Sequence, residues 1–150
     1  MPFAVAIQEE DFDVAALQRR LVAGNTAVGA TASFIGTVRG NSGETLLRME
    51  LEHYPGMTER CIGEILEEAR TRWSLLAAQV VHRVGALVPG DQIVYVGVAS
   101  SHRGDAFQAC EFIMDYLKTR APFWKKELSG QGARWVEARE SDSAAADRWQ

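Results

Sequence analysis

The chain has 150 residues, of which 47% are hydrophobic and 24% charged, a composition typical of one ordinary globular domain. Its net charge of −4 argues against a nucleic-acid-binding protein, because such a protein needs a broad basic face. The N-terminus lacks the pattern of a secretory signal, and no apolar stretch approaches the roughly 18 residues of a membrane span, so we expect a cytoplasmic protein without membrane contact.

The first part of the chain predicts a short strand, a helix and a long β-like run. The strand covers residues 3–7, and the helix covers 14–22 with Asp11 or Asp13 as its N-cap. Residues 27–38 form the β-like run.

A loop, a strand and a helix follow. Glycine, asparagine and serine at 40–43 are typical of a loop. Residues 46–54 alternate with the period of a strand, and a helix is predicted over 57–73. The positions expected on the apolar side of the strand are Leu47, Met49, Leu51 and His53.

Two strands and a strongly patterned helix come next. The strands cover 78–84 and 92–99, and the turn at 89–91 between them predicts a hairpin-like unit. The helix covers 106–118, with Asp105 as its expected cap. Its apolar stripe consists of Phe107, Cys110, Ile113, Met114 and Leu117.

The chain closes with two predicted strands, at 123–128 and 134–140, and a polar tail. We expect one domain over residues 1–140 and a polar tail over 141–150 that is loose apart from Trp149. Because strands and helices do not alternate regularly, the order of elements predicts an α+β fold with a mainly antiparallel sheet and flanking helices.

Residues 116–127 place four cations and three aromatic residues together in an otherwise acidic chain. Clustered cations beside apolar surface lose hydration and repel one another, which lowers lysine pKa values and makes an amine usable as a base or nucleophile. The alternative is a surface patch in which the stems of the cationic side chains cover the aromatic rings.

Two further sets of residues suggest an anion site. His102 and Arg103 lie at a predicted helix start, where free amide groups and the helix dipole attract anions. Alternatively, His102 caps or packs, and Arg103 pairs with Asp105. Arg39 ends a predicted strand just before the loop, a position suited to ligand contact or simply an exposed arginine.

Several kinds of chemistry lack support in the sequence. Cys61 and Cys110 form no CxxC pair, and His53, His82 and His102 do not have metal-ligand spacing, so we expect no metal. Dinucleotide and nucleoside triphosphate motifs are absent, and we expect no cofactor.

The ordered set of motifs resembles the MoaE family, the large, catalytic subunit of molybdopterin synthase. The resemblance covers residues 27 to 140, and the lysine-containing segment is its most specific part. The matching stretches are 34–39, 51–57, 82–85, 89–91, 96–98, 101–103, 115–125 and 135–137.

This resemblance implies an α+β fold of the α/β-hammerhead type and a homodimer. Each copy would bind a small ubiquitin-like sulfur-carrier subunit, giving a heterotetramer. The carrier ends in Gly-Gly with a thiocarboxylate, whose sulfur is transferred to cyclic pyranopterin monophosphate to form the molybdopterin dithiolene. No metal or cofactor takes part in this step.

The resemblance also implies roles for individual residues. Lys118 matches the main catalytic lysine, and Lys125 matches the second active-site lysine. The loop at 40–44 carries no expected site, and Arg139 is a weaker candidate for contact with the carrier or the pocket. The expected substrate-binding residues are Thr37, Val38, Arg39, His102, Arg103, Lys126 and Glu127.

Two other functions use the same groups. A non-catalytic dimeric receptor for a Gly-Gly protein tail would have the same groove and cations, but would tolerate loss of Lys118. A small phosphate-ligand or RNA-binding protein would use the cationic patch, although the acidic composition argues against it.

Overall fold

The computed structural model describes residues 2–40, 46–130, 132–136 and 140–150. Most of the loop predicted at 40–43, and candidate residue Arg139, lie outside this part of the chain. Among the described residues, no helix is long and apolar enough to cross a membrane.

The described strands form two four-stranded sheets rather than one. The first sheet has the order β1 (Phe3–Gln8), β4 (Leu75–Arg83), β6 (Gln92–Ser100) and β2 (Ala30–Thr37). The second has the order β5 (Gly85–Leu87), β3 (Leu46–His53), β7 (Phe123–Ser129) and β8 (Gly132–Val136). Only the pairing of β1 with β4 is parallel among the described strands, so the prediction of a mainly antiparallel α+β fold is confirmed.

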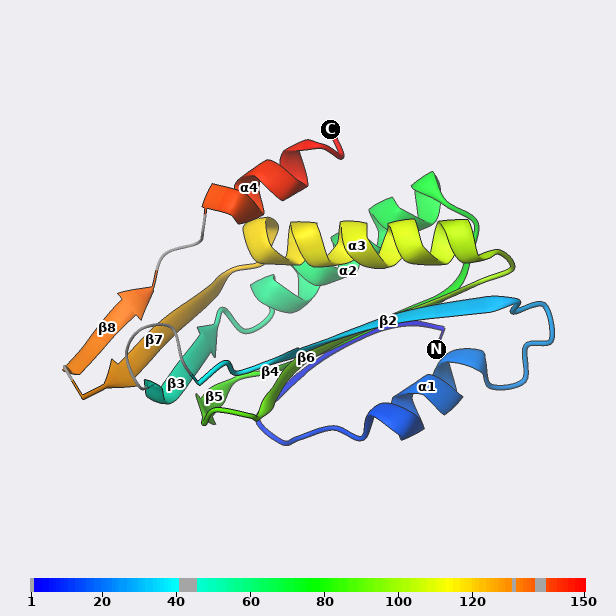
Figure 1. The fold of residues 1–150 in the computed structure, drawn as a ribbon. Helices are drawn as coiled ribbons and strands as arrows, with labels where there is room; N and C mark the ends of the chain where they lie inside the picture. Colours follow the sequence, from blue (N-terminus) through cyan, green and yellow to red (C-terminus); the bar gives the residue numbers. More distant parts are fainter. Residues whose placement is uncertain (1, 41–45, 131, 137–139) are drawn as a thin grey trace.

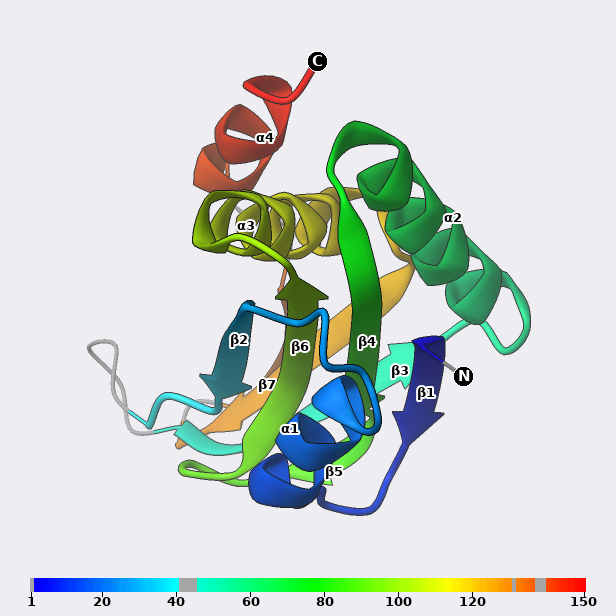
Figure 2. The same cartoon turned by 90° about the vertical axis from the view of Figure 1, so that its right-hand side faces the viewer.

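Helices cover both faces of the first sheet (Figure 1). Helices α2 (Met57–Arg72) and α3 (Arg103–Arg120) pack on one face, and α1 (Val14–Val22) packs on the other. The main core lies between the first sheet and the α2–α3 layer. The second sheet lies at the C-terminal end of α3, and Figure 2 shows β1 and β2 at the two edges of the first sheet.

The predicted hairpin-like unit is confirmed as an antiparallel pairing of β4 with β6. Strand β5 intervenes between them and pairs with β3 in the second sheet. Gly85 has a φ of 89°, a backbone conformation that side chains rarely permit, and this allows the chain to leave β4 for the other sheet.

Two predicted boundaries in the N-terminal half need refinement. Asp13, not Asp11, caps α1, since its carboxylate accepts a 3.2 Å hydrogen bond from the Ala16 backbone N. Strand β2 begins at Ala30 instead of residue 27, because Asn25 organises a turn through a 2.9 Å bond from the Ala27 backbone N.

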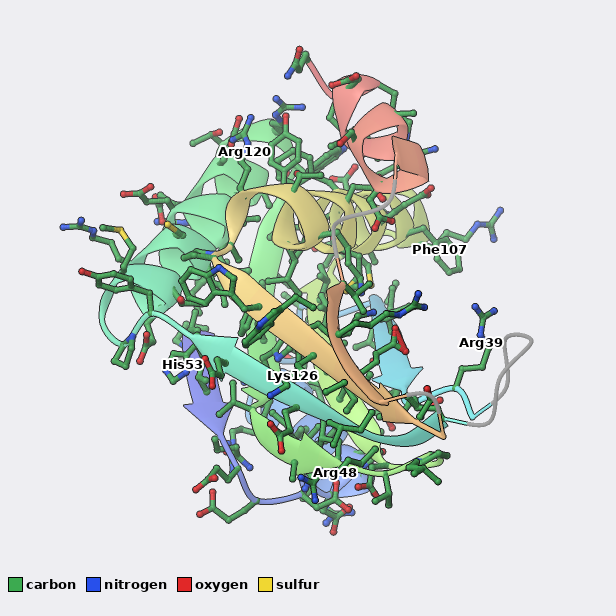
Figure 3. All side chains as sticks on the ribbon, turned by 90° about the vertical axis from the view of Figure 1, so that its left-hand side faces the viewer. Arg39, Arg48, His53, Phe107, Arg120 and Lys126 are labelled. Carbon is green, nitrogen blue, oxygen red and sulfur yellow. The ribbon has the colours of Figure 1, made fainter. Side chains whose placement is uncertain are left out.

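The apolar stripes were predicted well, with two exceptions. Met49 and Leu51 of β3 are buried, but Leu47 is 58% exposed because the register shifts between Leu46 and Arg48. Phe107 of α3 was also predicted to be inward and is 65% exposed; it projects from the helix in Figure 3.

The N-terminus of α3 differs from the prediction as well. The helix begins at Arg103, and His102 occupies the N-cap position. Asp105 is not the cap, since its carboxylate accepts a 3.2 Å hydrogen bond from the Ser74 backbone N.

The C-terminal prediction of a strand to residue 140 and a loose tail is wrong. Strand β8 ends at Val136, and residues from Glu140 to Asp147 form α4, which packs on α3. Trp149 anchors this segment, since its ring lies 5.6 Å from Trp73 and 5.7 Å from Phe112.

Candidate functional site

The last turn of α3 carries the candidate catalytic lysine. Tyr116 and Leu117 are buried and fix this turn in the core, whereas Lys118 is exposed. The helix ends two residues later, because Ala121 is extended and Pro122 cannot continue the helix. A cation in the last turn is stabilised by the partial negative charge at a helix C-terminus.

A buried threonine holds the short connector between α3 and β7. The Thr58 hydroxyl donates a 2.9 Å hydrogen bond to the Pro122 carbonyl oxygen. The Thr58 oxygen also accepts a 2.9 Å bond from the Tyr54 backbone N. Because β7 begins at Phe123, only Ala121 and Pro122 separate it from α3.

The two faces of β7 have different surroundings. Phe123 packs against the main core, and Lys125 lies opposite the buried Leu51 in the register with β3, so these side chains share the inner face. Trp124 and Lys126 alternate with them and lie on the outer face. In agreement, the Lys126 ammonium lies 5.7 Å from the ring centroid of Trp135, its partner on β8.

His82, at the end of β4, lies between the elements that carry the two lysines. Its ring stacks on Phe123 with centroids 4.0 Å apart and an interplanar angle of 18°. Burial, followed by the proximity of Lys118 and His53, lowers the pKa of His82 to about 4, so the ring is neutral near neutral pH. The stack therefore lies close to Lys118 on one side.

Lys125 follows Phe123 by two residues on the same face of β7, about 7 Å along the strand. Lys118 and Lys125 thus lie near the same buried stack, although α3 and β7 are different elements.

The strand-end residues of β2 divide into two kinds. The side chain of Val38 is buried in a small core with Met49 and Leu51, and its backbone N–H and carbonyl bond to Asp91 and Gly90 at 2.9 Å each. The side chain of Val38 therefore belongs to this small core, and its role in substrate binding stays a prediction. Thr37 and Arg39, on either side of it, are exposed, and Figure 3 shows Arg39 extending at the edge of the molecule.

His102 and Arg103 are not brought to the lysines within one copy of the chain. Both are exposed at the N-terminus of α3, while Lys118 lies in its last turn. The helix rise puts Arg103 about 22 Å from Lys118. Asp105, the alternative partner of Arg103, instead bonds to the Ser74 backbone N.

Lys126 and Glu127 lie on opposite faces of β7. Glu127 shares the inner face of β7 with Lys125, but Lys126 lies on the outer face beside Trp135. Of these two expected substrate-binding residues, Glu127 is therefore the one that shares a face of β7 with Lys125. The alternation of side chains along a strand is the signal that separates consecutive lysines.

The sequence gives His82 no metal-ligand spacing and predicts no site at this position. His82 is packed, but its position beside Phe123 and Lys118 depends on the meeting of β4, α3 and β7. No local pattern around residue 82 indicates that meeting.

The chain is similar to known proteins of one family. A family model described as MoaE protein matches residues 7–120. The chain is 60% identical over 146 residues to the molybdopterin synthase catalytic subunit of Ralstonia nicotianae, covering 97% of this chain and 83% of that protein. It is 53% identical over 151 residues to the protein of the same name from Vibrio cholerae, covering 100% of both. Among solved structures, the molybdopterin biosynthesis MoaE protein from Burkholderia ambifaria matches with a TM-score of 0.85 and 54% identity, covering 99% of this chain and 98% of that one.

Proposed function

Because the chain belongs to the MoaE family, we propose that it acts as the catalytic subunit of molybdopterin synthase, a sulfurtransferase of molybdenum cofactor biosynthesis. Its curated relatives carry that name at 53% and 60% identity over nearly the whole chain. A catalytic subunit implies at least one further subunit, which we take to be a small sulfur carrier.

The proposed reaction moves sulfur from the carrier to a pterin. The donor is a C-terminal Gly-Gly thiocarboxylate on a ubiquitin-like carrier, and the acceptor is cyclic pyranopterin monophosphate. Sulfur attack on the pterin side chain links it to the carrier as a thioester, and water then hydrolyses this thioester so that the sulfur stays on the pterin and the carrier leaves as a carboxylate. These steps, the opening of the cyclic phosphate and the loss of oxygen as water all require proton transfers. A positioned amine can carry out such transfers, and cations attract both the thiocarboxylate and the phosphate.

The observation that carries this proposal is the placement of Lys118 and Lys125 near one buried stack. Lys118 lies at the end of α3 close to His82, and Lys125 follows Phe123 on the inner face of β7. We assign Lys118 to general acid–base work and Lys125 to holding negative charge. Glu127, on the same face, is available to shape the same wall.

A second copy of the chain would complete the anion site. Arg103 lies about 22 Å from Lys118 along α3, too far to act on the same substrate. We propose a homodimer in which His102 and Arg103 of one copy approach Lys118 of the other, with Arg39 contributing to the same site. The exposed Phe34 and Ile35 on edge strand β2 offer apolar surface for such an association.

With one carrier on each copy, the assembly would be a heterotetramer. We place it in the cytoplasm, where thiols stay reduced, and both cysteines of this chain, Cys61 and Cys110, are free.

The test is a reconstituted sulfur-transfer assay with thiocarboxylated carrier and cyclic pyranopterin monophosphate. The wild-type chain should form the dithiolene, and Lys118→Ala should fold normally but lose nearly all transfer. Lys126→Ala is the matched control, because Lys126 lies on the outer face of β7, and it should retain most of the activity. Tight carrier binding without product from any of the three proteins would instead support a receptor for the carrier tail.

A further inference from the structure

The environment of His82 has a feature that the acid–base scheme does not use. The imidazole is only 8% exposed, and one face is covered by the Phe123 ring at 4.0 Å. Its Nδ1 lies 2.8 Å from the Arg83 carbonyl oxygen. The stack on Phe123 and the hydrogen bond to Arg83 therefore fix the orientation of the His82 ring.

The hydrogen bond to Arg83 determines which nitrogen carries the proton. A carbonyl oxygen can only accept, so Nδ1 must donate, and in a neutral imidazole Nε2 is then left with a lone pair. Burial keeps the ring in this neutral form, with a pKa of about 4.

The charged and titratable groups facing His82 come from three elements. Lys118 lies in the last turn of α3, near enough for its charge to lower the pKa of His82. His53 approaches from β3, where it pairs with Phe123 in the register and lies 4.0 Å from the Glu59 carboxylate. Arg83, next in β4, directs its guanidinium to the Glu9 and Gln92 carbonyls. The Arg83 guanidinium is engaged with two carbonyls and the His53 ring lies beside Glu59, so we assign the Lys118 ammonium as the donor to the lone pair.

We propose that His82 is a positioning residue for Lys118, whose ammonium it orients through the Nε2 lone pair while its stack on Phe123 holds the start of β7. The first action places the candidate catalytic amine, and the second fixes the strand that carries Lys125. A protonated His82 would lose the lone pair and repel the ammonium. The expected effect on kcat rests on the proposed function, whereas the contact between His82 and Lys118 does not.

Two substitutions test the effect of the aromatic ring and the effect of the Nε2 acceptor separately. His82→Phe keeps an aromatic ring for the stack and removes the acceptor, whereas His82→Gln supplies an amide oxygen that can accept near the Nε2 position. We expect His82→Phe to lower kcat about tenfold or more, the value of one hydrogen bond to a charged group, with less than about a twofold change in KM for either substrate. His82→Gln should restore most of kcat.

A control variant accounts for general loss of stability. Leu21→Ala removes a buried side chain of α1 on the opposite face of the first sheet, so it should lower the melting temperature without changing kcat. A loss of kcat in Leu21→Ala equal to that in His82→Phe would overturn the proposal, as would a wild-type kcat in His82→Phe.

A spectroscopic readout tests the contact without reference to sulfur transfer. The chain has three lysines, Lys118, Lys125 and Lys126, so the Nζ signals of ¹⁵N-lysine-labelled protein can be assigned by substitution. His82→Phe should shift the Lys118 signal and leave Lys126 in place. If the wild type transfers no sulfur, the proposed function fails while this shift still supports the contact, and an unmoved Lys118 signal overturns the contact whatever the activity.

Discussion

The indole Nε1 of Trp149 donates a 2.6 Å hydrogen bond to Oδ2 of Asp115, and this bond joins the end of the chain to the middle of α3. The Arg148 guanidinium bonds to the same carboxylate oxygen at 2.9 Å. Arg148 also pairs with Glu111, one turn earlier on α3. A single aspartate thus holds two consecutive residues that follow α4.

Replacing Asp115 should loosen this attachment. Asp115→Ala removes two hydrogen-bond partners from a side chain that is 15% exposed, and we expect the free energy of unfolding to fall by about 1–3 kcal/mol. Urea denaturation measures the loss. Glu111→Ala is the control, because Glu111 is 56% exposed and solvent screens its ion pair with Arg148, so the loss of stability should be smaller. Equal losses in the two variants would contradict this assignment.

His82 should make stability depend on pH. The unfolded chain protonates this histidine below its ordinary pKa of 6.5, whereas the folded chain resists protonation until about pH 4. Stability from His82 is therefore complete above pH 6.5 and falls as the pH drops to 4, by about 3 kcal/mol in total. Urea denaturation across this range should show a smaller fall in His82→Gln. Parallel curves for the two proteins would refute the prediction.

Two glycines should respond to alanine in opposite ways. At Gly97 in β6, a Cβ would overlap the Tyr95 hydroxyl and lie 2.6 Å from Cζ of the same buried ring. Gly97→Ala should cost about 1–3 kcal/mol through overpacking. At Gly63 in α2, a Cβ meets nothing within 4 Å, so Gly63→Ala should stabilise the protein by about 0.4–1 kcal/mol. Melting temperatures distinguish the two, and a stable Gly97→Ala would show that the Tyr95 ring can move.

Arginine can test whether Lys118 acts through charge or proton transfer. Lys118→Arg keeps a cation but cannot release its proton at working pH, so transfer should fall nearly as far as in Lys118→Ala. Lys125→Arg should retain more activity if Lys125 only holds negative charge. Single-turnover transfer with carrier binding measured in parallel separates the two effects. High activity in Lys118→Arg would exclude an acid–base role.

Mixing two inactive variants tests the shared site. Lys118→Ala and Arg103→Ala should each be inactive alone. The two variants are dissociated, mixed and reassociated. If each site combines Lys118 of one copy with Arg103 of the other, every mixed dimer contains one intact site. Because about half of the dimers are mixed, about a quarter of all sites are then intact. Sulfur transfer should recover to that extent. If mass spectrometry shows mixed dimers but sulfur transfer does not recover, Lys118 and Arg103 of different copies do not share a site.

Local patterns predicted what depends on neighbouring residues. The N-cap at Asp13, the inward Leu51 and the end of α3 before Pro122 follow from capping, alternation and proline chemistry. Leu47 departs from its pattern because a register shift with β7 alters the alternation, and this shift depends on the partner strand.

The site was predicted only in part for the same reason. The lysine-containing segment stands out by composition, but the meeting of His82 with Phe123 depends on how β4 and β7 approach each other. The separation of Arg103 from Lys118 follows from the full length of α3, which the sequence pattern underestimated at its N-terminal end. Helix α4 is short and polar, and it is held by contacts of Trp149 with distant rings, which no local pattern shows.

The two-residue connector between α3 and β7 also limits how this chain can evolve. Because Thr58 holds the Pro122 carbonyl and β7 starts at the next residue, the connector has no slack to absorb an insertion or deletion. One added residue would shift the strand by one step and exchange its inner and outer faces, so that the side chain of Lys125 would turn outward. Selection on this segment therefore acts on its length as well as on its residues.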